Sequence, residues 1–471
     1  MRFCIPFALG AILAAQTLPP TPTVAPLQSL GTRADAALKA YVEEVLSRHP
    51  ERQRAAEAVR VEEAKIPQAR SLEDPVLSFE MAREPGMNGE MREDMQTKGL
   101  MLSQVLPWPG KRKQRETVAR QEAAGLEAVQ ERVRLGLRAE AKRTFLSLIL
   151  AREQAMLLDE QDALAAQAEA ALRARFETGQ GSQAELLRAQ LERSRFLQKR
   201  WALEAELTAR LAALNALRNH PTAEPFDTPF TLESLPVPEE ADWKAYEEGA
   251  EARSPEVVAA EAHLVHANAA IHENRLNLRP DFVVSGGLMR ADNIGTGWKV
   301  GVGLSLPIFA ATKQRKAIQQ WEAEHRMHMG ERGVAALNLN RAQAERRAQV
   351  EGLRKVLALY REGLLIQSRA TLDATLAQLE TGRGSYLAAL EAIRGLVSDR
   401  SAMLDTLAQL HAHAIAAEEL NAGPTPPVPG VNLGGSAMPS TGGSPGVAAG
   451  NAMPKKESEA APAASSPMKS M

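Results

Sequence analysis

Aromatic residues and cysteine are scarce in this chain. Only 4% of its 471 residues are Phe, Trp or Tyr, although 44% are hydrophobic, so most of the apolar content is Ala and Leu. Small aliphatic side chains of this kind favour long helices that pack closely over a bulky globular core. The single cysteine, Cys4, lies in the N-terminal segment, so the rest of the chain has no disulfide, Cys-ligated metal or Cys nucleophile.

The chain also lacks a surplus of charge and a long apolar run. Its 56 basic and 58 acidic residues are interleaved and leave a net charge of −2. Interleaved charges predict solvated helix faces and argue against nucleic-acid binding, which needs a basic surplus. Past the N-terminal segment, no window approaches the ~20 apolar residues of a membrane-spanning helix. Contact with a membrane would therefore use β-strands or the protein surface.

The two ends of the chain are predicted to lie outside the folded part. Residues 1–16, MRFCIPFALGAILAAQ, have the pattern of a secretory signal peptide, with a cytosolic start and an incidental apolar stretch as the alternative. The Pro-rich residues 17–32 are predicted to form an extended linker. Residues 422–471 have no periodicity and are predicted to be a disordered tail.

Between these ends, two segments show the same order of elements. Residues 33–219 and 242–420 each read as a helix, a strand pair and a long helical hairpin, and a Pro-rich loop at 220–241 separates them. The motif KQR at 113–115 recurs at 313–315. A tandem duplication is the simplest explanation.

The strand pairs carry a clear alternation of side chains. In WKVGVGLSL, residues 298–306, large apolar side chains alternate with Lys, Gly and Ser. Similar patterns predict four strands, at about 76–84, 96–106, 281–290 and 298–308. These lengths suit a tilted strand that crosses a bilayer. A soluble sheet with its apolar face on a core is the alternative, but no remaining segment offers a covering layer.

Four strands cannot close a transmembrane barrel, because the smallest have about eight. An open sheet edge in a bilayer leaves backbone groups unsatisfied. If these strands span a membrane, several chains must pool them: two chains give eight strands, and three give twelve with room for a pore.

A short motif, E-T-G-x-G-S, interrupts each long helical pattern. It occurs as ETGQGS at 177–182 and as ETGRGS at 380–385. The helix before the first copy, 111–177, would be roughly 100 Å long, so the chain must turn at its end. The glycines permit the positive φ angles of such a turn, and the serines can cap the next helix.

Three motifs resemble the TolC family of bacterial outer-membrane efflux proteins. They are QVLPWPGKRKQR at 104–115, RFETGQGSQAELLRAQ at 175–190, and VGVGLSLPIF followed by KQRKA within 300–317. The first leans toward the heavy-metal efflux branch of the family. The resemblance covers about 35–420 and implies a mainly α fold with long coiled-coil hairpins. It also implies a homotrimer whose chains each add four strands to one twelve-stranded barrel in the cell outer membrane.

The resemblance further implies a helical tunnel that extends into the periplasm. Its lower end would dock onto a periplasmic adaptor, which joins it to an inner-membrane efflux pump. Acidic side chains narrow the tunnel of family members near this end, and the nearest matches are Glu185 and Glu391, although Ala388 stands where the second half would show an acid. The adaptor-facing residues carried over are Thr178, Gly179, Gln180, Gly181, Ser182, Thr381, Gly382, Arg383, Gly384 and Ser385.

Two further groups of residues could bind metals. The pairs His263/His266 and His325/His328 have helical i,i+3 spacing, but solvated histidines are the favoured interpretation. Five methionines near the first strand pair could meet a soft ion, but lipid-facing or loop positions are favoured: Met81, Met87, Met91, Met95 and Met101. The sequence predicts no metal, cofactor or catalytic site.

The leading interpretation is a passive outer-membrane export duct whose energy comes from its pump. The alternative is a periplasmic coiled-coil adaptor, for which one hairpin per chain and a compact β-domain would be expected. A structural filament and an enzyme rank lower. The sequence leaves the cargo open between a metal cation, a drug and a secreted polypeptide.

Overall fold

The computed structural model describes residues 27–84, 95–291 and 295–430, all of which belong to one unit, Met1–Leu433. The predicted signal peptide lies outside the described residues. The linker was predicted to end at residue 32, and this boundary is wrong, because helix α1 begins at Leu27. Its proline-free end continues the helical pattern that follows, so no residue there stops the helix.

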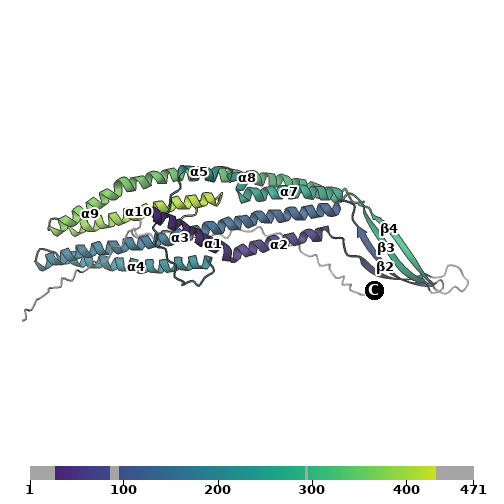
Figure 1. Ribbon diagram of the computed structural model, residues 1–471, viewed down its shortest axis with the longest axis horizontal. Coiled ribbons are helices and arrows are strands. Elements are labelled where there is room, and N and C mark those ends of the chain that lie inside the picture. The colour runs from purple at the N-terminus through teal and green to yellow at the C-terminus, as the bar shows by residue number, and fades with distance from the viewer. Residues whose placement is uncertain (1–26, 85–94, 292–294, 431–471) are drawn as a thin grey trace, which may run out of the picture. The chain divides into compact units, whose positions relative to one another are not determined.

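Helices make up most of the described chain (Figure 1). Two helices precede the first strand pair in the sequence, α1 (Leu27–Arg48) and α2 (Pro50–Arg70), and two follow it, α3 (Lys111–Glu177) and α4 (Gln183–Leu217). A 3-10 turn (Leu232–Ser234) and the short helices α5 (Glu240–Glu247) and α6 (Ala250–Arg253) follow. The second set is α7 (Pro255–Leu276), α8 (Gln314–Leu359), a π-helical turn (Tyr360–Leu364), α9 (Leu365–Glu380) and α10 (Tyr386–Glu418).

Helix α3 is the central element of the packing. Its 67 residues run without a break, and it contacts α2, α4, α7 and α10. Its buried positions are mostly Ala and Leu, which allow neighbouring helices to approach closely. The main hydrophobic core surrounds Phe145, which packs against Tyr41 and Phe226 with ring centroids 5.8 and 6.1 Å away.

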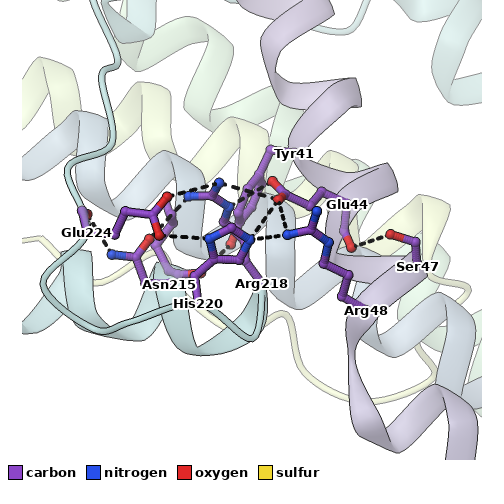
Figure 2. A network of polar contacts seen from close by, with 9 residues as sticks. Tyr41, Glu44, Ser47, Arg48, Asn215, Arg218, His220 and Glu224 are labelled. Atoms are coloured by element: carbon purple, nitrogen blue, oxygen red, sulfur yellow. Dashed lines mark hydrogen bonds and ion pairs between the residues drawn. The ribbon is translucent and has the colours of Figure 1, made fainter.

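A polar network fixes α1 against the end of α4 (Figure 2). Arg218 donates to both carboxylate oxygens of Glu44, at 2.8 and 3.4 Å. These hydrogen bonds lower the pKa of Glu44 below its usual value. His220 bridges Glu44 and Glu224, at 3.0 and 2.8 Å, so the chain that leaves α4 is tied to α1.

Glu153 is a buried carboxyl group in α3. Its side chain is 8% exposed and accepts a hydrogen bond from the backbone N–H of Leu232. Burial raises its pKa to about 7, from 4.5. Because the folded pKa is above the unfolded one, this group's contribution to stability is fully present below pH 4.5 and is lost as pH rises through 7.

We therefore expect Glu153→Gln to stabilise the protein at pH 8 by on the order of 2 kcal/mol and to have little effect at pH 4. The amide oxygen keeps the hydrogen bond from Leu232 without the cost of a buried charge. Thermal unfolding followed by circular dichroism at both pH values measures this. Glu127→Gln, at an exposed position of the same helix, is the control. Equal effects at both pH values would contradict the prediction.

The four strands form one antiparallel sheet in the order β1–β2–β3–β4 (Figure 1). They are β1 (Val76–Glu84), β2 (Met95–Leu106), β3 (Asp281–Ala291) and β4 (Gly295–Ser305). The central pairing, β2 with β3, joins segments far apart in the sequence. The fourth strand was predicted to reach 308, but β3 begins at Asp281, whose partner is Ser305, so the ladder ends there.

Residues 421–430 are here called the C-terminal strap. A disordered tail was predicted to begin at residue 422, and this is wrong for 422–430. This segment packs on the helices: Val428 is buried in the main core, and buried arginines donate to the carbonyl oxygens of Asn421, Gly423 and Pro429. A proline-rich extended segment needs no periodicity to pack, so its sequence pattern gave no sign of order. The remainder of the predicted tail, 431–471, lies outside the described residues.

Candidate functional site at the hairpin tips and the sheet

The first hairpin turns between α3 and α4. Gly179 has φ +74° and donates to Phe176 O at 3.0 Å, while Gln180 N donates to Arg175 O at 2.8 Å. These bonds form a Schellman-type end to α3. Ser182 Oγ then accepts from Ala184 N at 3.2 Å and caps α4.

The second hairpin turns in nearly the same way between α9 and α10. Gly382 has φ +75° and donates to Leu379 O at 3.1 Å, and Arg383 N donates to Gln378 O at 2.9 Å. Ser385 Oγ caps α10 by accepting from Ala388 N at 3.2 Å. The predicted capping role of both serines is confirmed.

The glycines of each tip have two different roles. Gly179 and Gly382 need the left-handed conformation, and an added Cβ at either would meet nothing within 4 Å. The prediction of positive φ is wrong for the second glycine of each motif. A Cβ on Gly181 would lie 2.8 Å from Phe176 N, and one on Gly384 would lie 3.0 Å from Leu379 N. These glycines are required because the chain crosses the end of the preceding helix.

The tip residues are open to solvent in the described chain. Thr178 and Thr381 are exposed, and their hydroxyls donate to helix carbonyl oxygens of the preceding turn. Gln180 and Arg383 are exposed as well. Their side chains are therefore available for contact with another molecule.

The two acidic residues proposed for a tunnel constriction occupy different positions. Glu185 is half-buried in the first turn of α4, where the helix dipole favours a negative charge. Glu391 is exposed on α10, beyond its first turn.

The sheet has one apolar face that no described residue covers. Nine of its large side chains are between 50% and 79% exposed. The register aligns them in rows across all four strands, such as Phe79, Leu100, Leu288 and Trp298. This apolar sheet face consists of Leu77, Phe79, Leu100, Leu102, Leu288, Trp298, Val300, Val302 and Leu304. Uncovered area of this kind marks a binding or membrane surface.

The WPGK part of the first motif joins the sheet to α3. Lys111 is only 3% exposed, and its ammonium group donates to Asp281 Oδ1 and to Arg279 O, both at 2.8 Å. Trp108 N also donates to Asp281 Oδ1 at 2.8 Å, and the Trp108 ring stacks on Phe282. The motif therefore fixes the start of α3 to the start of β3.

The histidine pairs do not assemble a metal site. His263 and His328 stack with ring centroids 5.2 Å apart, and His266 pairs with Glu122 at 3.1 Å. Burial lowers the pKa of His266, which favours its neutral form. Within the described ranges, no three His, Cys, Asp or Glu side chains are grouped so that they could hold a metal ion. Two of the five methionines, Met87 and Met91, lie outside those ranges.

Among the residues that the structure describes, no helix has the length and hydropathy needed to span a bilayer.

Comparisons with known proteins agree on one group. Residues 248–421 match the family model described as Outer membrane efflux protein. Over 364 residues the chain is 25% identical to the Cobalt-zinc-cadmium resistance protein CzcC of Cupriavidus metallidurans, which covers 76% of this chain and 83% of that protein.

Several solved structures share the fold. The VceC outer membrane protein of Vibrio cholerae matches with a TM-score of 0.68 at 16% identity, over 83% of this chain and 97% of that one. The outer-membrane channel OprN matches with a TM-score of 0.66 at 18% identity, over 84% of this chain and 92% of that one. CusC matches with a TM-score of 0.63 at 20% identity, over 81% of this chain and 90% of that one.

Proposed function

Because this chain belongs to the outer membrane efflux protein family, the TolC family that its motifs resemble, we propose that it forms the outer-membrane duct of a tripartite efflux system. It is a passive conduit from the periplasm to the exterior, and an inner-membrane pump supplies the energy. The observation that carries this proposal is the apolar sheet face, which is attached directly to long helical hairpins. A lipid-exposed sheet on a helical tunnel accounts for both features.

The duct is proposed to be a homotrimer. Each chain contributes β1–β4 to a twelve-stranded barrel in the cell outer membrane, and the hairpins form a tunnel that extends into the periplasm. The pairing of β2 with β3 supports this arrangement, because it unites the two strand pairs in one sheet that continues in register. The two similar hairpins are proposed to have arisen by duplication, since Gly179 and Gly382 have nearly equal φ angles, +74° and +75°.

The periplasmic adaptor is the less favoured function. An adaptor needs no uncovered apolar sheet, whereas the apolar sheet face of this chain has side chains that are up to 79% exposed. Fractionation separates the two functions. We expect the protein in the outer membrane, as a trimer that resists dissociation by detergent. A soluble periplasmic protein would overturn the duct and support the adaptor.

The tips are proposed to dock onto the adaptor, with six tips per trimer. The docking residues are those of the two E-T-G-x-G-S motifs, Thr178–Ser182 and Thr381–Ser385. Their small and exposed residues allow another helical hairpin to approach closely. Glu185 and Glu391 are proposed to narrow the tunnel above the tips.

We expect Gln180→Trp combined with Arg383→Trp to abolish export while the trimer and its outer-membrane yield stay unchanged. These positions are exposed and have ordinary φ angles, so a bulky side chain blocks docking without strain in the turn. Gly179 and Gly382 are poorer targets, because their positive φ makes any substitution disturb the fold as well. Export is measured as resistance of cells to a toxic cargo.

The matched control is Gln180→Ser with Arg383→Ser, which keeps both positions small and polar. It should retain export. Normal export by the Trp variant would show that the tips serve only as turns.

Divalent metal cations are the proposed cargo. The similarity to the Cobalt-zinc-cadmium resistance protein CzcC favours this class over drugs and polypeptides. Deletion of the gene should lower the tolerance of cells to cobalt, zinc or cadmium. If only tolerance to organic toxins falls, the duct remains and the cargo assignment is wrong.

A further inference from the structure

The C-terminal strap lies across both helical hairpins of the chain. It begins on the second hairpin, where Arg346 of α8 donates to Asn421 O, to Gly423 O at 3.2 Å and to Thr425 Oγ1 at 3.3 Å. His413 of α10 also contacts Thr425, with Nδ1 3.1 Å from the hydroxyl oxygen. Helix α8 continues through the π-helical turn into α9, so α8 and α10 belong to the two arms of the second hairpin. Both arms therefore hold the first half of the strap.

Its second half lies on the first hairpin. Arg210 of α4 donates from Nη1 to Pro429 O and to Ser147 O of α3, both at 2.7 Å. Val428 is 7% exposed and belongs to the core that surrounds α3. A Cβ built on Gly430 would lie 3.5 Å from Leu150 Cδ2 of α3 and 2.7 Å from Asp405 Oδ1 of α10, so the strap ends in contact with both hairpins.

Two grooves with corresponding helix residues lie beside the strap, which itself lines part of each. One groove, between α8 and α10, has a volume of about 600 Å³, and the other, between α3 and α4, has about 370 Å³. Pro427 lines both. Four residues of one groove lie 203 positions from four of the other, the same separation as between Gly179 and Gly382: Arg143 and Arg346, Glu206 and Gln409, Ala209 and Ala412, Arg210 and His413.

The chemistry of the strap matches that of its two anchors. Pro424, Pro426, Pro427 and Pro429 have no backbone N–H, so these residues offer carbonyl acceptors and no donors. Arginine offers donors and no acceptor. Arg346 and Arg210 are 3% and 6% exposed, so both need protein acceptors in place of water. The strap supplies those of Arg346, and at Arg210 its Pro429 O adds to Glu206 and Ser147 O. Prolines also restrict the unbound segment, which lowers the entropy lost when it docks.

We propose that the C-terminal strap is a tether that fixes the separation of the two helical hairpins, with Arg346 and Arg210 as its anchors. A segment bound to both hairpins resists their separation, because undocking it removes the hydrogen-bond acceptors that Arg346 has in the described chain and the Pro429 O acceptor of Arg210, which keeps Glu206 and Ser147 O. Given the proposed function, this tether limits how far the tunnel can widen at its tips.

The separation of the tips can be measured directly in the purified protein. Spin labels on Gln180→Cys and Arg383→Cys, in a Cys4→Ser background, place one probe on each tip. Labelled chains diluted in excess unlabelled chain give trimers, or monomers, with one labelled copy. Pulsed electron–electron double resonance then reports the distance between the two spin labels of one chain. The measurement needs no export or membrane insertion, so it is independent of the proposed function.

Two truncations separate the strap from the residues after it. A chain that ends at Gly430 should give the same distance distribution as the full chain. A chain that ends at Leu420 should give a longer mean distance and a broader distribution, with helix content by circular dichroism retained. If the chain that ends at Leu420 is helical and its distance is unchanged, the tether is overturned.

Single anchors provide a test that does not depend on the truncation folding. Arg346→Gln should broaden the tip distance in the full chain, because it removes the cation and the hydrogen bonds of its guanidinium. Arg341→Gln, on the same helix and exposed, should leave it unchanged. A disulfide between Asp405→Cys and Gly430→Cys should narrow the distribution again when added to Arg346→Gln. Equal distributions for Arg346→Gln and Arg341→Gln would contradict the proposal.

Discussion

Gly287→Ala is expected to abolish assembly of the sheet. A Cβ at this position would clash with the carbonyl oxygen of Leu100 and lie 2.8 Å from Met101 Cγ and 2.9 Å from Met101 Cα. Two of these three atoms are backbone, so no side-chain rotation relieves the contact. The strands would have to separate, and the β2–β3 ladder would lose its hydrogen bonds at the pairing of Gly287 with Met101. We expect a cost of ~3 kcal/mol or more, above the usual range for overpacking.

The neighbouring residue provides a matched control. A Cβ on Gly286 would meet only Lys299 O, at 4.0 Å, so Gly286→Ala should be tolerated. The readouts are strand content by circular dichroism and, under the proposed function, the yield of detergent-resistant trimer after outer-membrane extraction. Equal yields for the two alanine variants would mean that β2 and β3 do not approach as closely as the structure shows.

Val302→Arg is expected to prevent insertion of the trimer. The Val302 side chain is 74% exposed on the apolar side of β4, between Val300 and Leu304, so under the proposed function it contacts lipid. An arginine on the lipid face near mid-membrane costs ~2–4 kcal/mol, and a trimer carries three copies. We expect loss of the protein from the outer membrane and accumulation of chains in the periplasm.

Lys299 shows why the position matters. It is a natural cation of the same strand, but it lies on the opposite face, which the duct turns toward water under the proposed function. Val302→Leu keeps the apolar character and should insert normally. A normal amount of Val302→Arg trimer in the outer membrane would remove the lipid-facing assignment of the apolar sheet face.

Periodicity in the sequence predicted the parts of this fold that have a repeating pattern. The alternation in 298–306 marked most of β4, and the proline-free run from Lys111 predicted α3. Alternation did not define the end of β4. Leu306 and Ile308 continue the apolar pattern, but β3 begins at Asp281 and has no residue that could pair with them. Pairing length depends on the partner strand, which a local pattern does not contain.

Features that depend on contacts between distant residues were not predicted. The C-terminal strap has no period, and its order comes from arginines 75 or more positions earlier in the chain. Buried arginines in polar helices were the available signal, but nothing in the sequence shows which of them are buried. Similarly, the motif E-T-G-x-G-S shows its glycines as equivalent, whereas only the structure separates Gly179, which needs positive φ, from Gly181, which lies against Phe176.

The order β1–β2–β3–β4 leaves one side of β1 and one side of β4 without a strand partner in the described chain. Under the proposed function, a lone chain in a bilayer would hold these edges at a high free-energy cost, so insertion and association would have to occur together. The rate of duct formation should therefore rise more steeply than linearly with the concentration of periplasmic chains. At low expression most chains would wait as monomers with exposed edges, where they are vulnerable to aggregation and proteolysis.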